Sequence, residues 1–173
     1  YLVKDLDMIA ELERGRINIE FTTFNLTALV QDVIDLLEIK AEKNNIRLSL
    51  NYPIHQPIKV VGDIQKIQQV LINLIVNAIN YSNPNTEVII DFDDFDDKIQ
   101  VSIKDQGVGI KQEDLDRVFE RFYRVDKSRN RNNGGSGLGL AIVKHILEAH
   151  KQKIYVSSKV GKGSTFSFYL QKV

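Results

Sequence analysis

The apolar residues of this 173-residue chain change their spacing several times, from helical to alternating and back. Helical spacing predicts helices at 1–14, 25–44 and 64–82, a short one at 112–122, and one that begins in a glycine-rich segment and ends near residue 150. Alternating or short apolar runs predict strands at 46–52, 58–62, 86–92, 98–105, 153–158 and 164–170. Helices interspersed with strands in this order predict an α/β (α+β) two-layer sandwich, in which helices pack on a mixed sheet.

The composition is that of an ordinary globular domain, with 43% hydrophobic and 27% charged residues. The formal net charge is zero, which gives no electrostatic reason to expect nucleic acid or an anionic membrane as a partner. Cysteine is absent, which excludes disulfides, thiolate metal sites and cysteine nucleophiles. No apolar run approaches about 18 residues and no signal-peptide pattern opens the chain. We therefore expect a cytoplasmic domain, and any membrane anchor would belong to other parts of a longer parent protein.

Glycine fills four of the six positions that precede the last predicted helix: Gly134, Gly135, Gly137 and Gly139. A glycine inside a helix costs about 1 kcal/mol relative to alanine, so this density needs a reason. The segment does not match the dinucleotide motif G-x-G-x-x-G, because the sixth position of a motif that begins at Gly135 is Leu140. Glycines allow close backbone approach to a ligand, and free N–H groups at a helix start attract anions. An anion site is one interpretation, and a plain flexible connection is the other.

The predicted helix 64–82 carries a row of amide side chains beside its apolar stripe. Gln69, Asn73, Asn77 and Asn80 recur at spacings of 4, 4 and 3 residues. An interior asparagine costs a helix roughly 0.6 kcal/mol relative to alanine, whereas Glu or Lys would solvate the face at less cost. The row therefore predicts a polar ligand surface, with a merely exposed face as the alternative.

A lone carboxylate, Asp105, ends the strand predicted at 98–105 and is followed by Gly107 and Gly109. A buried carboxylate is costly unless it accepts hydrogen bonds. An exocyclic amine is a suitable donor, and adenine offers one where guanine offers a carbonyl oxygen. Asp105 is thus a candidate for adenine recognition, although an ordinary Asp-Gly turn would have the same sequence.

Together these segments resemble the nucleotide-binding catalytic domain of sensor histidine kinases, in the GHKL (Bergerat) superfamily. The matching segments are "NLIVNAINYS" (N box), "DQGVGI" (G1 box), "FERFYR" (F box), "GGSGLGL" (G2 box) and "GKGSTFSF". The resemblance implies a Bergerat fold, with a mixed five-stranded sheet on three helices and a mobile ATP lid at about 122–136. It also implies two parts: residues 1–18 as the end of a dimerisation and phosphotransfer helix, and 19–173 as the catalytic domain.

The resemblance further implies ATP and Mg²⁺ as ligands. Asn77 would coordinate Mg²⁺, Tyr81 would stack on adenine, and Asp105 would accept a hydrogen bond from its amino group. Arg124 would stabilise the transferred phosphoryl group, Thr165 would close the base pocket, and Phe119 with Phe122 would anchor the lid. The remaining implied ATP-binding residues are Asn73, Asn80, Gly107, Gly109, Ile110, Tyr123, Arg129, Gly135, Ser136, Gly137, Leu138, Gly139 and Leu140.

Two departures from the family pattern matter. The family commonly has Lys at the position of Asn80, so Lys127, Arg129 or Arg131 would have to supply the missing charge. The phosphorylated histidine of the family is followed by an acid and soon by a proline, and none of the three histidines, His55, His145 and His150, fits this pattern. We therefore expect the phosphoacceptor histidine to lie outside this chain.

The implied activity is transfer of the ATP γ-phosphoryl group to that histidine and then to a response regulator. Hydrolytic relatives carry a general-base Glu four residues before the metal-binding Asn; here that residue is Asn73, which cannot abstract a proton from water. The implied partners are the chain's own dimerisation and phosphotransfer domain, a receiver domain and, for the parent protein, a second copy of itself. Two alternatives remain open: an anti-sigma-type serine kinase, and a non-catalytic ATP-sensing docking module.

Overall fold

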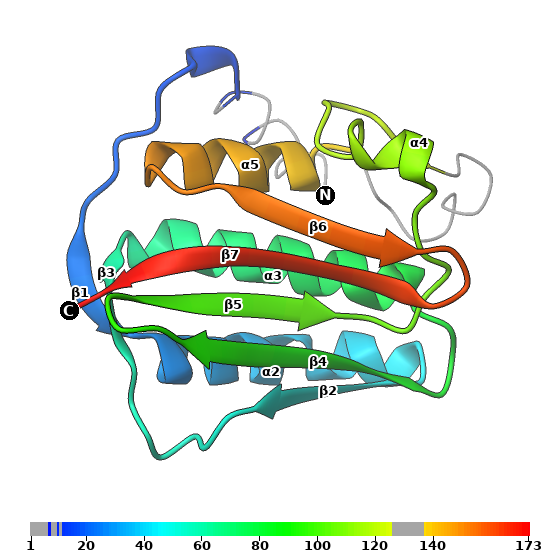
Figure 1. The fold of residues 1–173 in the computed structure, drawn as a ribbon, viewed down its shortest axis with the longest axis horizontal. Helices are drawn as coiled ribbons and strands as arrows, with labels where there is room; N and C mark the ends of the chain where they lie inside the picture. Colours follow the sequence, from blue (N-terminus) through cyan, green and yellow to red (C-terminus); the bar gives the residue numbers. More distant parts are fainter. Residues whose placement is uncertain (1–6, 8–9, 11, 126–136) are drawn as a thin grey trace.

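A seven-stranded mixed sheet forms one layer of the computed structural model, which describes residues 7, 10, 12–125 and 137–173 (Figure 1). The strands are β1 (Thr22–Asn25), β2 (Ile46–Asn51), β3 (Lys59–Gly62), β4 (Thr86–Asp94), β5 (Lys98–Lys104), β6 (Ile154–Lys159) and β7 (Gly163–Lys172). They follow the order β1-β3-β7-β5-β4-β2, and β6 also pairs with β7. The β2–β4 pair is parallel and the other pairs are antiparallel.

Three helices form the second layer behind this sheet: α2 (Leu26–Lys43), α3 (Ile64–Tyr81) and α5 (Gly139–Ala149) (Figure 1). The predicted two-layer sandwich is thus confirmed, but the described sheet has seven strands, where the apolar pattern predicted six and the resemblance implied five. The strand β1 was not predicted because it has only four residues, of which Phe24 alone is buried, and this is too short to show alternation. Within the described residues, no helix has the length and apolar character needed to cross a bilayer.

Side-chain caps fix the starts of the two long helices where the sequence predicted them. Asn25 Oδ1 accepts a hydrogen bond from the Ala28 N–H at 3.2 Å, at the start of α2. Asp63 Oδ1 likewise accepts from the Lys66 N–H at 3.2 Å, at the start of α3. Such caps satisfy N–H groups that the first helical turn leaves without partners. Leu138, before α5, has no polar side chain and cannot cap in this way.

The core lies between the sheet and its helices, and it extends directly into the region of Asp105. Alternate residues of the central strands face the helices: Ile99, Val101 and Ile103 on β5, and Phe166, Phe168 and Leu170 on β7. Because side chains alternate along a strand, Asp105 continues the first row and Ser164 continues the second. A carboxylate and a hydroxyl therefore stand at the end of an otherwise apolar core.

The segment predicted as one helix at 112–122 contains only a short helix, α4 (Gln112–Leu115), followed by turns. The residue before α4, Lys111, makes no side-chain cap hydrogen bond. At the other end, Phe122 has φ of +64°, a left-handed conformation that cannot continue a helix. By contrast, residues 12–14 are helical and the helix ends at Gly15, which has φ of +64°, as predicted.

Candidate functional site

Three segments that are distant in sequence meet at one end of the core: α3, the loop that follows β5, and the start of α5. The Asn73 amide nitrogen on α3 donates to the Gly139 carbonyl oxygen at 3.3 Å. At the end of α3, the Tyr81 carbonyl oxygen accepts from the Val108 N–H at 3.3 Å. Asn77 is half-buried and lies one helical turn from both Asn73 and Tyr81, so it faces the same side of α3. The fold thus gathers segments that the sequence singled out separately.

Asp105 is buried, with 7% of its surface exposed, and only one of its carboxylate oxygens is hydrogen-bonded. Its Oδ1 accepts from the Gly107 N–H at 2.9 Å and from the Ser164 N–H at 3.1 Å. Burial raises the pKa of the Asp105 carboxyl above its usual value, and the two backbone hydrogen bonds partly oppose this shift. Within the described part of the chain no donor reaches Oδ2, which leaves this oxygen available to a ligand.

The glycines of the loop after β5 are required by contacts within the protein itself. A Cβ atom on Gly107 would lie 2.2 Å from the Tyr81 carbonyl oxygen. Gly109 has φ of +75°, and a Cβ there would lie 2.2 Å from the Lys159 carbonyl oxygen. Any larger residue would displace this loop from α3 and from β6. Gly107 therefore allows the Asp105 loop to lie close to α3, and Gly109 allows it to lie close to β6, whatever the ligand.

The segments on either side of residues 126–136 meet near α5. The Phe122 N–H donates to the Gly137 carbonyl oxygen at 2.8 Å. Phe119 makes an edge contact with the core residue Phe166, with ring centroids 6.1 Å apart. Tyr123 contacts α4 instead: its hydroxyl donates to Asp114, and the Arg117 guanidinium lies 4.4 Å from its ring centroid. The predicted site residues Arg129, Gly135 and Ser136 lie outside the described residues.

The other predicted residues lie around this region with different degrees of burial. Leu138 is fully buried, and Leu140 and Ile110 pack against the core. Asn80, Tyr81 and Arg124 are half-buried. All of the described ones belong to α3, to the loop after β5, to the segment around Phe122 or to the start of α5, except Thr165.

The structure brings Ser164, rather than Thr165, to the Asp105 carboxylate. Thr165 occupies the next position of β7, in the row of Ser167 and Tyr169, which faces away from α3. The Ser164 hydroxyl lies 2.8 Å from the hydroxyl of Ser158, at the end of β6. Sequence reasoning missed both serines. Ser164 could have been found from the alternation of "STFSFYL", which puts it in the row of Phe166 and Phe168.

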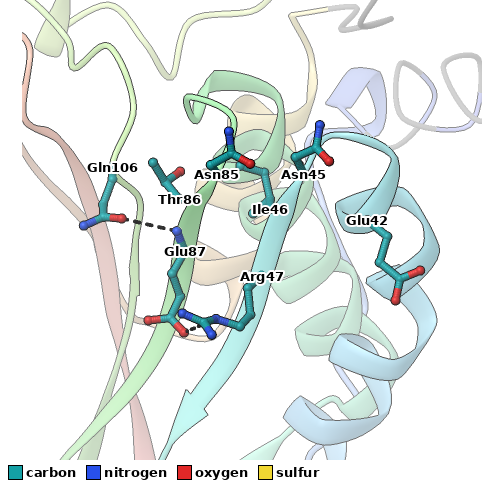
Figure 2. A pocket seen from close by; sticks show the side chains of 8 residues that line it. All are labelled: Glu42, Asn45, Ile46, Arg47, Asn85, Thr86, Glu87 and Gln106. Atoms are coloured by element: carbon teal, nitrogen blue, oxygen red, sulfur yellow. Dashed lines mark hydrogen bonds and ion pairs between the residues drawn. The ribbon is translucent and has the colours of Figure 1, made fainter.

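A separate open cavity of about 640 Å³ lies between the end of α2 and the starts of β2 and β4 (Figure 2). Its walls include an Arg47–Glu87 ion pair of 3.0 Å, and the Gln106 side chain accepts from the Glu87 N–H at 3.2 Å. None of the predicted site residues lines it. Gln106 is its one link to the Asp105 loop, so we do not assign this cavity to the site.

Comparison with known proteins gives consistent matches. Residues 62–173 match the family described as "Histidine kinase-, DNA gyrase B-, and HSP90-like ATPase". The chain is 37% identical over 171 residues to the sensor histidine kinase WalK of Bacillus subtilis, a match that covers 98% of the chain and 28% of WalK. The structure of the catalytic domain of histidine kinase ThkA is 33% identical, with a TM-score of 0.74, over 88% of this chain and 96% of that one.

A second structure contains histidine kinase ThkA in complex with the response regulator protein TrrA. It matches with a TM-score of 0.79 and 29% identity, over 99% of this chain and 48% of the ThkA chain. The chain thus spans less than a third of WalK and about half of that ThkA chain. The family match begins at Gly62, the last residue of β3, runs to residue 173, and so includes Asn77, Asp105 and Gly139. The chain belongs to the histidine kinase-, DNA gyrase B- and HSP90-like ATPase family, as the ATP-binding catalytic domain of a sensor histidine kinase.

Proposed function

We propose that the site around Asp105 binds Mg·ATP and that this domain transfers the γ-phosphoryl group to a histidine outside the chain. The observation that carries the proposal is the state of the Asp105 carboxylate. Two backbone N–H groups hold Oδ1, while no described donor reaches Oδ2. An accessible acceptor oxygen on a largely buried carboxylate favours a ligand that brings an N–H group, as adenine does and guanine does not at the matching position.

The start of α5 supplies the second support, because packing against the described residues does not explain Gly139. A Cβ atom there would find the Asn73 side chain at 4.0 Å, an ordinary contact distance. Alanine would also suit a helix better than glycine does. A triphosphate held against the first N–H groups of α5 would account for a position without a side chain.

The amide face of α3 fits a magnesium ion that is carried by the nucleotide. Mg²⁺ retains several waters and takes few protein ligands, so one amide oxygen and the phosphates suffice. Asn77 would hold the ion, and Asn73 and Asn80 lie one turn to either side of it. When bound, the ion neutralises phosphate charge during transfer. Asn73 has no basic side chain to activate a water, which favours transfer to a protein acceptor over hydrolysis.

The partners follow from this proposal and from the relatives. The ThkA structure contains a response regulator, which supports a receiver domain as the final phosphoryl acceptor here. We assign residues 1–18 to the end of a dimerisation and phosphotransfer helix and residues 19–173 to the catalytic domain. The acceptor histidine would lie on the missing part of that helical domain, in a dimeric parent protein.

Titration calorimetry on the chain of residues 1–173 tests the nucleotide site. We expect binding of Mg·ATP, weaker binding of Mg·GTP, and loss of measurable Mg·ATP binding in Asn77→Ala and Asp105→Ala. Asp32→Ala, an exposed carboxylate on α2, serves as the control and should bind as the parent chain does. Equal affinities for the two nucleotides would disprove the role of Asp105.

Transfer is then followed with labelled ATP. The chain alone should acquire no stable label, whereas an added helical domain with an acceptor histidine should become labelled with an acid-labile phosphate. Acid-stable phosphoserine on a partner would favour a serine kinase instead. A folded chain that binds no nucleotide would contradict the proposed function as a whole.

A further inference from the structure

We infer that Ser158 is a positioning residue that holds Asp105 and Ile110 in the geometry needed to recognise the nucleotide base. The inference rests on the proposed nucleotide site and concerns a residue that does not touch it directly. Ser158 is half-buried near the end of β6, and its side chain crosses from β6 to the loop after β5. Its hydroxyl oxygen accepts from the Ile110 N–H at 2.7 Å.

The same hydroxyl group also contacts the start of β7. It lies 3.0 Å from the Gly163 carbonyl oxygen and 2.8 Å from the Ser164 hydroxyl. A serine hydroxyl carries one proton and two acceptor sites. Ser158 can therefore accept from Ile110 while it donates to one of these two oxygens, so a single side chain joins the loop to the start of β7.

This link reaches Asp105 through one further residue. The Ser164 N–H donates to Asp105 Oδ1 at 3.1 Å, and the Ser164 carbonyl oxygen accepts from the Asp105 N–H at 2.9 Å. Ser158 thus fixes both ends of the loop: Ile110 directly, and Asp105 through Ser164. The orientation of Asp105 decides where Oδ2 points, and this direction separates adenine from guanine. A small rotation of the Asp105 carboxylate therefore affects the discrimination between adenine and guanine more than it affects the stability of the fold.

The neighbouring Ser157 provides a matched control. It lies on the same strand and is exposed, on the opposite face from Ser158. Removal of its hydroxyl changes the same number of atoms without touching the loop. The isosteric pair Ser158→Thr and Ser158→Val provides a second comparison, because the two variants differ only in whether a hydroxyl group is present.

The experiment measures dissociation constants of Mg·ATP and Mg·GTP by calorimetry for the parent chain and these variants. We expect Ser158→Ala and Ser158→Val to bind Mg·ATP on the order of tenfold more weakly, which is the loss of about one hydrogen bond in a partly buried network. Their preference for ATP over GTP should narrow. Ser158→Thr should keep both the affinity and the preference, and Ser157→Ala should match the parent chain.

The outcomes separate this inference from the function on which it rests. If the parent chain prefers Mg·ATP and Ser158→Ala retains that preference and affinity within twofold, the proposed function stands and the role of Ser158 is wrong. Equal losses of Mg·ATP affinity in Ser158→Thr and Ser158→Val would also overturn the inference, because the shape of the side chain rather than its hydroxyl group would then determine binding. A folded parent chain without nucleotide binding would overturn both.

Discussion

Burial of the Asp105 carboxylate lowers the stability of the fold, and the proposed ligand site would account for this cost. The carboxylate is removed from water by the surrounding core, and the backbone satisfies only Oδ1. Burial raises its pKa, which means that the folded chain holds the proton more tightly than the unfolded chain does. Stability therefore falls as the pH rises from the unfolded pKa, about 3.9, through the raised folded pKa, and it stays level above that interval.

Replacement of this carboxylate should separate stability from binding. An asparagine keeps an Oδ1 acceptor for the Gly107 and Ser164 N–H groups but carries no charge to bury. We expect Asp105→Asn to be at least as stable as the parent chain at pH 7. The difference in free energy of unfolding between the two proteins should develop as the pH rises from the unfolded to the folded pKa of Asp105. Urea unfolding across this pH range measures it, with the exposed Asp32→Asn as the control. A less stable Asp105→Asn at pH 7 would contradict this account of the burial cost.

Site residues that a local sequence pattern marks could be predicted. Site residues whose contacts depend on how the strands pair could not. Asp105 was recognised because two glycines follow it, and Asn73 and Asn77 because helical spacing aligns them. The contacts of Ser158 depend on the pairing of β6 with β7 and on the position of the loop after β5. Alternation along β6 places Ser158 in the row of Ile154 and Val156, opposite Ser157, but the partners of its hydroxyl could be found only from the structure.

At the scale of elements, capped helices were the most predictable. Each long helix starts after a residue with a capping side chain, Asn25 or Asp63, and each ends within about one residue of its predicted boundary. The four-residue elements β1 and α4 were missed or predicted too long, because so few residues show no period. Tertiary contacts define both: β1 pairs with β3, and the chain after α4 turns at Phe122 to contact Gly137.

The junction between α3 and the loop after β5 is the contact between elements on which the site depends most. A Cβ atom on Gly107 would lie 2.2 Å from the Tyr81 carbonyl oxygen, and one of the two backbones would have to move. We expect Gly107→Ala to lower the free energy of unfolding by about 1–3 kcal/mol, the usual effect of overpacking. It should also abolish Mg·ATP binding. Denaturant unfolding and calorimetry measure the two effects.

Gly139→Ala is the matched comparison, because among the described residues a Cβ atom there meets only the Asn73 side chain, at 4.0 Å. Its stability should be unchanged, or higher by up to about 1 kcal/mol from helix propensity. Its affinity for Mg·ATP should nevertheless fall, since the added methyl group would stand where we place the phosphates. Equal destabilisation by Gly107→Ala and Gly139→Ala would contradict this account, because the space around the two Cβ positions would then not determine the effect on stability.

At the scale of the whole molecule, the layer architecture was predictable but the arrangement of strands was not. Apolar period determines which segments are helices or strands, and their succession indicates helices on a sheet. The order β1-β3-β7-β5-β4-β2 depends on pairings between segments far apart in sequence, such as β5 with β7. The site also depends on these long-range pairings. Only the folded chain brings together the four segments that form it: α3, the loop after β5, the start of α5 and the β6–β7 turn.

The N-terminal tail is also held to the body of the molecule by such a long-range contact. The Arg121 guanidinium donates to the Leu12 carbonyl oxygen at 3.1 Å and lies 3.8 Å from the Glu13 carboxylate. Leu12 itself is buried in the core. Arg121 directly precedes Phe122, whose N–H contacts Gly137 at the start of the α5 segment. The end of the tail therefore rests on the segment that leads from α4 toward the start of α5.

Loss of this contact should loosen the tail without unfolding the domain. The Gly15 N–H donates to the same Leu12 carbonyl oxygen at 3.3 Å, so its hydrogen exchange reports the state of the tail. We expect Arg121→Ala to speed this exchange by about fivefold, as the loss of about 1 kcal/mol of local stability would do. The global free energy of unfolding should change by less than about 1 kcal/mol, because the ion pair is exposed. Arg117→Ala, which removes an exposed arginine paired with Glu120, should leave the Gly15 exchange unchanged. Equal exchange rates in the two variants would mean that burial of Leu12 alone holds the tail in place.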